Sequence, residues 1–241
     1  MSNLIIDIGN TAVKASRSDG MTIGKTFRYQ GEKVRNFILS LAAGDRPEVM
    51  VISSVYAISP ADEKLFEKEC GRLVLLDSAH TGLLGDYDLP DYLSYDRAAA
   101  LIAARYLFKG RGCTLFDFGT TFTVDFIDAE GRYEGGNISL GCRTRFRALN
   151  RYSRALPLLD TPDETPELGL DFKSSITGGI VTGIMFEIEG YSARHPENVL
   201  VFTGGDAIYF AKRTKKSIFA ICNLVLMGLA IIAEEYVKKN Q

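Results

Sequence analysis

The sequence predicts an α/β protein made of two related domains, each a mixed sheet flanked by helices. One pattern occurs twice: an apolar strand, a turn of the type Asp-x-Gly-Asn/Thr-Thr, a second strand, a tight turn and a third strand. Asp7 opens the first of these turns and Asp117 the second. Helical spacing alternates with short apolar strands in the rest of the chain. A duplication on this scale implies two domains of related architecture, which we place at residues 1–110 and 111–241.

The first half is predicted to open as an antiparallel meander rather than as a strand followed by a helix. Leu4–Ile8 is a compact apolar strand, the chain continues extended over Ala12–Ser16, and Asp19-Gly20 is a strong hairpin turn before Thr22–Arg28. The remaining elements of this half are predicted to be a helix at Glu32–Leu41, a strand at Val49–Ser53, a helix beginning at Ser59-Pro60, a strand at Leu73–Leu76 and an alanine-rich helix at Asp96–Phe108.

The second half repeats the meander and then adds helices. Its elements are predicted to be strands at Cys113–Phe116 and Phe122–Ile127, a third strand that begins at Arg132–Gly135, helices at about Arg143–Tyr152 and Ser174–Tyr191, a strand at Val199–Phe202 and a C-terminal helix. The apolar segment Ile218–Ala233 is too short to span a membrane comfortably and contains Asn223 and Gly228, so we expect a buried helix there.

The composition is that of an ordinary globular protein. Of 241 residues, 46% are hydrophobic and 24% charged, and the net charge is −2. This balance gives no basic field that would draw the chain to nucleic acid or an anionic membrane. Four scattered cysteines without CxxC spacing and no signal peptide favour buried, reduced thiols in a cytoplasmic protein. With only two histidines, which we expect on the surface or in loops, a histidine-ligated zinc site is not predicted.

The first turn has the residue types of a phosphate-binding site. Gly9 lets the backbone pass close to a phosphate, and the side chains of Asn10 and Thr11 can hydrogen-bond its oxygens. Asp7 at the end of its strand could hold Mg²⁺ through water, and Lys14 on the next strand would offset phosphate charge. Taken alone, the same residues would also suit a plain hairpin corner, in which Asn and Asp satisfy the geometry of the turn.

The second copy of the turn favours the phosphate-binding interpretation. Two such hairpins, one per domain with a nucleotide held between them, resemble the layout of the ribonuclease H-like actin-like ATPase and sugar kinase superfamily. The glycines after the strand at Val199–Phe202 are similar to the adenosine-contacting turn of that superfamily, although a structural turn is an equal alternative. The predicted ATP-binding residues of the second half are Gly119, Thr120, Thr121, Gly204 and Gly205.

A third group of residues falls at the predicted start of the alanine-rich helix. Asp96 could accept a hydroxyl proton from an acceptor substrate during phosphoryl transfer, and Arg97 could bind an anionic group. The alternative is helix capping, with Ser94 as N-cap and Asp96 stabilised by the helix dipole.

These motifs together resemble the type III pantothenate kinase family along nearly the whole chain. The resemblance covers Asp7–Thr11, Tyr87 and Pro90 followed by Asp96-Arg97, Asp117–Thr121, and Gly135-Gly136-Asn137-Ile138. It implies phosphorylation of pantothenate by ATP in coenzyme A biosynthesis, Mg²⁺, a monovalent cation (K⁺ or NH₄⁺) and a homodimer. The roles that it implies are Asp96 as base, Asp117 as monovalent cation ligand, Thr120 as ATP contact, and Tyr87, Ser94, Tyr95 and Arg97 as pantothenate-binding residues.

Four positions depart from the family pattern. Ala12 replaces Asn, Ser94 replaces Gly, Leu140 replaces Pro, and Phe172 stands where a substrate-binding Thr is usual. These changes affect the details of the pocket, so no role is carried over to Phe172.

Two other functions remain open from the residues. One is a sugar or acyl kinase of the same superfamily, and the other is a non-catalytic nucleotide-binding regulator, because a fold does not determine a function. A homodimer is also expected from the apolar helical segments Ile180–Ile188 and Ile218–Ile232, which hold more apolar surface than one chain needs.

Overall fold

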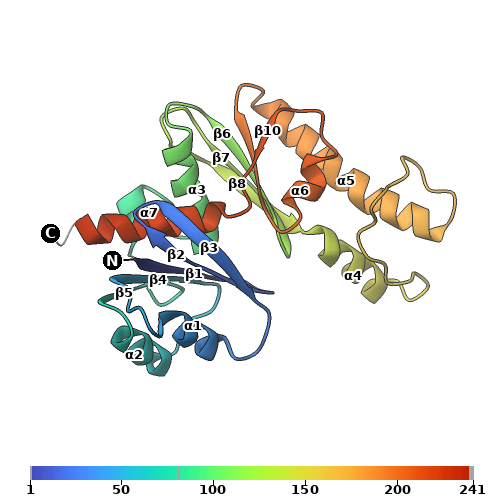
Figure 1. Cartoon of the computed structure of the whole chain (residues 1–241). Coiled ribbons are helices and arrows are strands. Elements are labelled where there is room, and N and C mark those ends of the chain that lie inside the picture. The colour runs from blue at the N-terminus through green and yellow to red at the C-terminus, as the bar shows by residue number, and fades with distance from the viewer. Residues whose placement is uncertain (1, 81, 239–241) are drawn as a thin grey trace. The chain divides into compact units, whose positions relative to one another are not determined.

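The computed structural model describes residues 2–80 and 82–238, and the chain forms two compact units (Figure 1). Unit 1 runs to Leu107 and resumes at Asn223, and unit 2 is Phe108–Cys222. Each unit contains one five-stranded mixed sheet with helices. The division of the chain differs from the predicted ranges at the C-terminus, because the last helix belongs to unit 1.

The sheet of unit 1 has the strand order β3-β2-β1-β4-β5. Its strands are β1 (Asn3–Ile8), β2 (Val13–Asp19), β3 (Thr22–Tyr29), β4 (Val49–Ser54) and β5 (Arg72–Leu76). The first three form the predicted antiparallel meander, and Gly20 adopts a φ of 53° in the turn between β2 and β3. The strands β1, β4 and β5 are parallel, so their carboxyl ends lie at one edge of the sheet.

Helices cover both faces of this sheet. They are α1 (Val34–Ala42), α2 (Pro60–Lys68), α3 (Tyr95–Leu107) and α7 (Leu224–Lys238), with a short 3₁₀ helix η1 (Gly85–Tyr87). The helix α2 begins as predicted, because Pro60 is at its first position and the Ser59 hydroxyl accepts the Asp62 N–H at 3.1 Å. The helices α1 and α2 contact β1 and β5 respectively, whereas α7 contacts α3, β1 and β4.

The contact between α3 and α7 depends on small residues. The side of α3 that faces inward is rich in alanine, and Ala99, Ala103 and neighbouring residues are buried. A Cβ added at Gly228 of α7 would overlap the carbonyl oxygen of Ala99. Gly228 therefore lets the backbones of the two helices approach more closely than a side chain would allow.

The sheet of unit 2 has the equivalent order, β10-β9-β6-β7-β8. Its strands are β6 (Cys113–Phe118), β7 (Thr121–Ile127), β8 (Tyr133–Leu140), β9 (Val199–Gly204) and β10 (Ile218–Ala220), and its helices are α4 (Cys142–Tyr152), α5 (Phe172–Arg194) and α6 (Ala207–Ala211). Stacked and edge-on phenylalanine rings fill the core, among them Phe116, Phe118 and Phe202. Both units thus use one strand plan, as the repeated sequence pattern predicts.

One sequence expectation about the C-terminal region is wrong. Ile218–Ala220 is not part of a buried helix but a strand paired in parallel with β9, and the helix begins only at Leu224. Most of the apolar helical residues that suggested a dimer are buried within their own units, as Ile184, Ile188, Leu229 and Ile232 show. Phe186 is an exception at 66% exposure, and the homodimer itself stays a prediction.

The cysteines partly follow the prediction. Cys70, Cys113 and Cys142 are buried and free, but Cys222 is also free and is exposed, because it lies in the turn between β10 and α7. Burial raises the pKa of the Cys70 and Cys113 thiols to about 11, which makes them unreactive near neutral pH.

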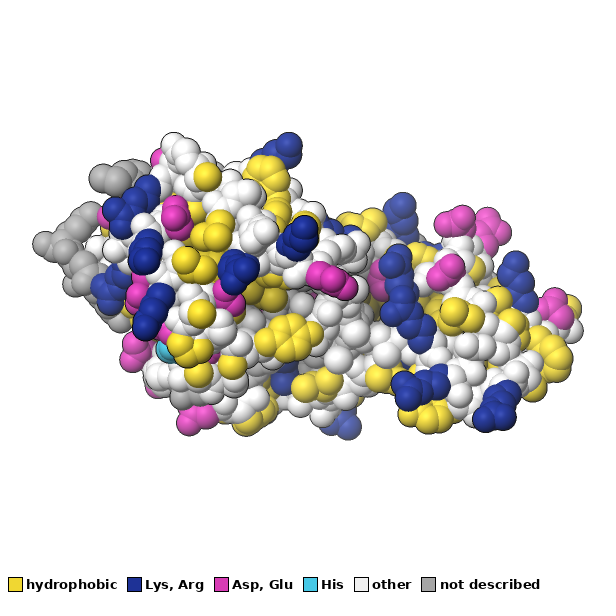
Figure 2. Space-filling view, turned by 90° about the horizontal axis from the view of Figure 1, so that it is seen from below, with side chains coloured by type: hydrophobic (Ala, Val, Ile, Leu, Met, Phe, Trp, Pro, Cys, Tyr) yellow, Lys and Arg dark blue, Asp and Glu magenta, His cyan; other side chains and the backbone are white. Residues whose placement is uncertain are grey.

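The surface mixes charges of both signs. On the face seen in Figure 2, Lys and Arg side chains are interspersed with acidic and hydrophobic ones. Large exposed hydrophobic side chains of unit 2 include Ile138 at 61% and Phe186 at 66% exposure. Among the described residues, no helix combines the length and the apolar character needed to cross a bilayer.

The close helix contact in unit 1 gives a testable consequence. We expect Gly228→Ala to lower the free energy of unfolding by about 1–3 kcal/mol, because the added methyl group is overpacked against Ala99. Intrinsic helix propensity alone would change stability by about 1 kcal/mol in the opposite direction. Urea denaturation measures the change in the free energy of unfolding.

Gly190→Ala in α5 is the matched control. Nothing lies within 4 Å of its added Cβ, so this change should not destabilise the protein. An equally stable Gly228→Ala protein would contradict this account.

Candidate functional site

The first predicted phosphate-binding turn lies at the carboxyl end of β1. Asp7 is half-buried and stands opposite Lys14 in the β1–β2 register, while Asn10 and Thr11 are exposed at the corner. The Gly9 N–H donates to the Ala12 carbonyl at 3.1 Å, which closes the corner. The structure thus brings all five predicted residues of the first turn onto one hairpin.

This hairpin forms one wall of a pocket of about 320 Å³ within unit 1. The rest of the lining comes from the end of β3 and from the segments after β3 and β4, including Tyr29, Gln30 and Tyr56. Ala12, the first departure from the family pattern, also lines the pocket, where it offers a methyl group instead of an amide. The pocket therefore combines polar groups of the corner with an apolar and aromatic wall. The complete lining is Ile8, Gly9, Asn10, Thr11, Ala12, Val13, Tyr29, Gln30, Gly31, Val34, Ser54, Tyr56 and Ile58.

The second predicted turn has the same construction at the carboxyl end of β6. Asp117 is half-buried, Gly119, Thr120 and Thr121 are exposed, and the Gly119 N–H donates to the Thr121 carbonyl at 3.0 Å. The start of α4 fixes this corner, because the Gly141 N–H and the Thr144 hydroxyl both donate to the Thr120 carbonyl, at 3.0 and 2.6 Å.

The predicted glycine turn after β9 lies directly beside Asp117. Gly204 adopts a φ of 91°, and a Cβ there would be 2.7 Å from the Phe118 N and would also overlap a carboxylate oxygen of Asp117. The Asp206 N–H donates to the Phe118 carbonyl at 3.1 Å. Only glycine fits this position, and it brings the β9 turn against the second hairpin corner. In unit 2 the structure therefore brings together the predicted residues Asp117, Gly119 and Gly204.

The predicted acceptor residues occupy the first turn of α3. Asp96 is half-buried and its Oδ1 accepts the Arg97 N–H at 2.9 Å, while Arg97 is buried at 7% exposure. Ser94 is exposed, and its carbonyl accepts the Ala98 N–H at 3.0 Å. The Asp96 carboxylate thus satisfies one backbone donor of the helix start, which agrees with capping but leaves its second oxygen available for another role.

The two predicted substrate-binding tyrosines direct their hydroxyls into unit 1. The Tyr87 hydroxyl donates to Glu235 of α7, and Arg105 of α3 donates to the Tyr87 carbonyl at 2.5 Å. Burial, followed by the bond to Glu235, raises the pKa of Tyr87 above its usual range. The Tyr95 hydroxyl donates to the His80 carbonyl at 2.8 Å. Both tyrosines therefore also have structural roles that the sequence did not predict.

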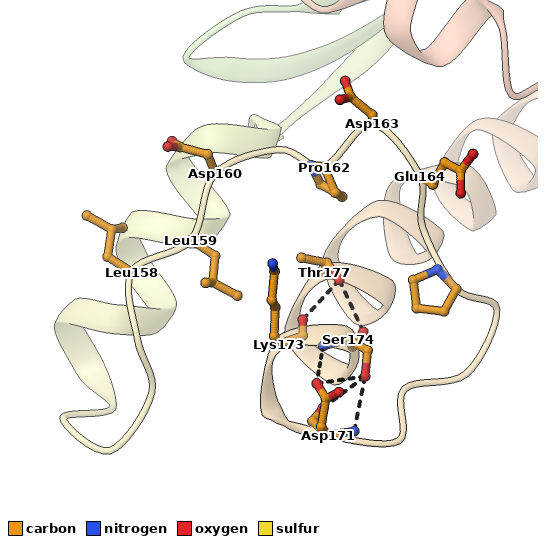
Figure 3. Close-up of a pocket in the computed structure, with 11 residues that line it drawn as sticks. Leu158, Leu159, Asp160, Pro162, Asp163, Glu164, Asp171, Lys173, Ser174 and Thr177 are labelled. Atoms are coloured by element: carbon orange, nitrogen blue, oxygen red, sulfur yellow. Dashed lines mark hydrogen bonds between the residues drawn. The ribbon is translucent and has the colours of Figure 1, made fainter.

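A second pocket, of about 680 Å³, lies in unit 2 between the loop before α5 and the first turns of that helix (Figure 3). Asp160, Asp163, Glu164 and Asp171 surround it, with Lys173 as the cation of its lining. Asp171 caps α5, since its carboxylate accepts the Ser174 N–H at 2.8 Å, and this lowers its pKa. The departure Phe172 is the first residue of α5 and is 71% exposed. Like charges make this pocket poorly suited to a polyphosphate.

The residues at the strand ends could hold cations. Within the described part of the chain, no group of three or more His, Cys, Asp and Glu side chains is arranged for a metal ion. Magnesium needs no such group, since it keeps most of its waters and accepts one or two carboxylates beside substrate phosphates. Asp7 and Asp117, each two residues before the glycine of its corner, fit that kind of site.

One polar cluster in unit 1 was missed from the sequence. Asp77, directly after β5, is fully buried and binds His80, which was expected to be a simple loop histidine. The sequence did contain an indication of this cluster, namely an aspartate directly after an apolar strand. If the end of such a strand is buried, the carboxylate needs hydrogen-bond donors from the protein.

Comparison with known proteins extends this picture. The family model of type III pantothenate kinase matches residues 3–194. A type III pantothenate kinase of Bacteroides fragilis is 34% identical over 233 residues, covering 94% of this chain and 95% of the relative. That of Phocaeicola vulgatus is 35% identical over 232 residues, covering 94% and 96%.

Solved structures show the same fold. A Campylobacter jejuni protein described as a Baf family transcriptional activator superposes with a TM-score of 0.64 at 19% identity, covering 98% of both chains. A ROK hexokinase from Thermus thermophilus gives a TM-score of 0.53 at 15% identity, covering 98% of this chain and 100% of the other. At these identities the likeness shows the fold alone, and it confirms the predicted class of two actin-like ATPase and sugar kinase domains. The family match and the relatives extend over most of the sequence, and the chain therefore belongs to the type III pantothenate kinase family.

Proposed function

We propose that the protein transfers the γ-phosphoryl group of ATP to the primary hydroxyl of pantothenate, giving 4′-phosphopantothenate in the first step of coenzyme A biosynthesis. The observation that carries the proposal is that a chain of this family has Asp96 and Arg97 on the first turn of α3, in the same unit as the Asp7 hairpin. Family membership supplies the substrate class, and the helix turn supplies groups that suit the chemistry.

The two hairpin corners would bind the phosphates of ATP. The side-chain amide of Asn10 and the hydroxyls of Thr11, Thr120 and Thr121 belong to exposed residues and can donate to phosphate oxygens. Lys14 would offset phosphate charge near the first corner. Gly204 and Gly205 would contact the adenosine, which is supported by their position beside the second corner.

Asp96 would act as the base. As the substrate oxygen bonds to the γ-phosphorus, the bond from that phosphorus to the bridging oxygen breaks, ADP leaves, and the hydroxyl proton passes to the Asp96 carboxylate. The second oxygen of that carboxylate would make this contact while the first holds the Arg97 N–H. Arg97 and Tyr87 would bind the pantothenate carboxylate and chain, together with the turn at Ser94 and Tyr95. Tyr95 would contribute through its backbone, because its hydroxyl is bound to the His80 carbonyl.

Cations complete the proposed site. Bound Mg²⁺ would neutralise charge on the transferring phosphates, and Asp7 would hold it through water. Asp117 would hold a monovalent cation, K⁺ or NH₄⁺, at the second corner. We place the activity in the cytoplasm, which is supported by the four free thiols.

We also propose a homodimer formed through unit 2. The strand β8 is an edge of its sheet and exposes Ile138 and Leu140, while Phe186 is exposed on α5. A hydrogen bond of 3.2 Å between Ser139 and Glu187 joins β8 to α5. An exposed apolar edge strand favours association unless another surface covers it.

The function is tested by measuring ADP release with pantothenate, with several sugars, with short acyl acids and with no acceptor, each with and without K⁺. We expect turnover with pantothenate only. Turnover with a sugar or an acyl acid would identify another kinase of the superfamily, and ATP binding without turnover would identify a regulator.

Asp96→Asn tests the base. We expect a loss of kcat of about 10²-fold or more with nearly parental KM for ATP, because the amide cannot take the proton. The free energy of unfolding should fall by at most about 1 kcal/mol, since Asn is a tolerable residue at a helix start. Steady-state kinetics and urea denaturation give both values.

Asp91→Asn is the control. Asp91 is an exposed aspartate in the same segment, and its variant should keep parental kcat. Near-parental turnover of Asp96→Asn would leave Asp96 with a capping role only.

Asp117→Asn tests the monovalent cation site. We expect weaker activation by K⁺ or a higher KM for ATP in a folded protein, because the neutral amide is a poorer cation ligand. Asp128→Asn removes a carboxylate beyond the far end of β7 and should leave both quantities unchanged. A K⁺ titration of activity at several ATP concentrations distinguishes weaker K⁺ activation from a higher KM for ATP. Identical curves for Asp117→Asn and the parent would refute the assignment of Asp117 as cation ligand.

The dimer is tested by light scattering across micromolar concentrations. We expect twice the mass of one chain for the parent and a shift toward the monomer for Phe186→Asp, because a charge would be buried in the interface. Tyr106→Asp, at an exposed aromatic position of α3 in unit 1, is the control and should remain dimeric. A parental monomer mass at every concentration would exclude the dimer.

A further inference from the structure

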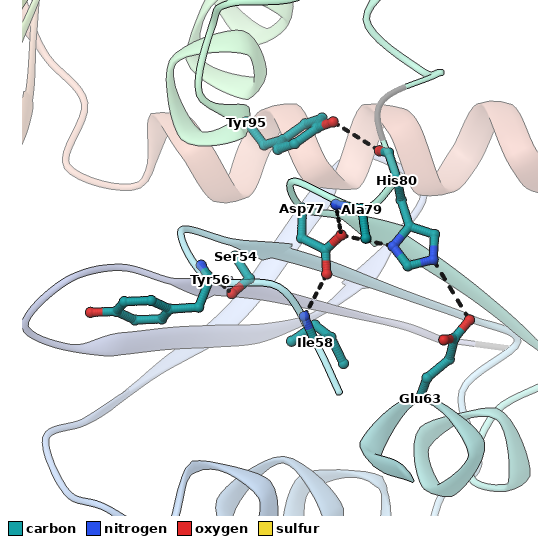
Figure 4. Close-up of polar contacts among 8 residues, drawn as sticks. All are labelled: Ser54, Tyr56, Ile58, Glu63, Asp77, Ala79, His80 and Tyr95. Atoms are coloured by element: carbon teal, nitrogen blue, oxygen red, sulfur yellow. Dashed lines mark hydrogen bonds and ion pairs between the residues drawn. The ribbon is translucent and has the colours of Figure 1, made fainter. Parts of the chain in front are cut away.

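A buried carboxylate follows directly after β5 in unit 1. The Asp77 side chain has no exposed surface and accepts three hydrogen bonds (Figure 4). Its Oδ2 accepts the Ile58 N–H at 2.6 Å, and its Oδ1 accepts the Ala79 N–H at 2.9 Å and a bond from His80 Nδ1 at 2.7 Å. Because backbone and imidazole donors occupy both oxygens, the arrangement is that of a structural anchor rather than of a cation site.

The charge of Asp77 is compensated by these donors. Burial alone would raise the pKa of this carboxyl, but the hydrogen bonds from Ile58, His80 and Ala79 and the nearby imidazole lower it below its ordinary value. The carboxylate therefore stays ionised at neutral pH and holds its three donors with charge-assisted bonds, which are stronger than neutral ones.

His80 extends this anchor to two helices. Its Nε2 lies 3.7 Å from a carboxylate oxygen of Glu63 on α2, and its backbone carbonyl accepts the Tyr95 hydroxyl at 2.8 Å. Tyr95 is the first residue of α3 and is buried at 8% exposure. Burial, with the nearby charges of Asp77 and Asp91, raises the pKa of Tyr95, so its phenol remains a donor at neutral pH.

The anchor lies at the edge of the sheet that carries the first hairpin corner. In the strand register Asp7 of β1 pairs with Ser53 of β4, and Ser53 pairs with Leu76 of β5, the residue before Asp77. Ile58, held by Asp77, lines the hairpin pocket. One carboxylate therefore holds both the wall of the pocket and, through His80 and Tyr95, the first turn of α3.

We propose that Asp77 and Tyr95 are positioning residues that fix the first turn of α3, and with it Asp96, relative to the phosphate-binding hairpin. This inference rests on the proposed function insofar as Asp96 is the base. Phosphoryl transfer needs the hydroxyl, its base and the phosphate within hydrogen-bonding distance of one another, so a small shift of the helix start lowers the rate. The side chains of Asp77 and His80 act through the turn and need not touch the substrate.

Tyr95→Phe is the mildest test, because it removes only the hydroxyl. We expect kcat/KM for pantothenate to fall about fivefold to tenfold, the worth of one net hydrogen bond, with an unchanged KM for ATP. Hydrogen exchange followed by mass spectrometry should show faster exchange of the amides at 95–98 and parental exchange in the second half of α3. Tyr106→Phe removes a hydroxyl from an exposed position of the same helix and should change neither quantity.

Asp77→Asn is a second test of the positioning role. It replaces an acceptor with an amide donor that faces backbone N–H groups, so its effect should be larger than that of Tyr95→Phe. The two changes combined should lower kcat/KM by less than the product of the single effects, because both act through the segment at 79–80. If Asp77 and Tyr95 only stabilised the fold, the two changes would lower the free energy of unfolding. The ratio of kcat/KM for pantothenate to kcat/KM for ATP would then stay unchanged.

The outcomes separate this inference from the proposed function. Parental exchange at 95–98 in a folded Tyr95→Phe protein overturns the positioning role, and so does an equal rise in KM for ATP and for pantothenate. A parent protein that does not phosphorylate pantothenate refutes the proposed function instead. In that case the exchange arm still decides whether Asp77 and Tyr95 hold the start of α3.

Discussion

The middle strand of each sheet pairs in parallel with one neighbour and in antiparallel with the other, and the rest of the molecule depends on this arrangement. An antiparallel partner can follow after a tight turn, so the chain reverses at once where β1 and β6 end. A parallel partner brings its own carboxyl end to the same edge, which puts Asp7 beside Ser53 and Asp117 beside Thr203. Polar groups therefore gather at one edge of each sheet although β1, β4, β6 and β9 are mostly apolar.

The two units support this edge in different ways. In unit 2 a glycine removes the side chain that would separate β9 from the corner, so Gly204 lies against Asp117. In unit 1 the support is polar, because the Val55 N–H donates to the Ile8 carbonyl and the Asp77 carboxylate holds the following segment at Ile58. In unit 2 the strand end is held by close backbone approach, and in unit 1 it is held by hydrogen bonds, one of them to a compensated buried carboxylate.

The sequence predicted features that are set by nearby residues and missed those set by distant ones. The hairpin corners, the Ser59 cap and the repeated strand plan depend on short segments and were predicted. β10 was missed because three strand residues precede an apolar helix and share its composition. The Tyr87–Glu235 bond joins residues 148 positions apart in the chain, so no local pattern could indicate it. Periodicity likewise shows that α7 has buried residues but not which sheet covers them.

The return of α7 to the first sheet has a consequence for the order in which the chain folds during synthesis. Unit 2 is contiguous, and all of its residues are synthesised before those of α7. The first 107 residues meanwhile lack the helix that packs on α3, β1 and β4. Domains made early usually fold early, but here the first unit made is the last that can close, and its uncovered apolar surface is exposed for as long as unit 2 is being translated.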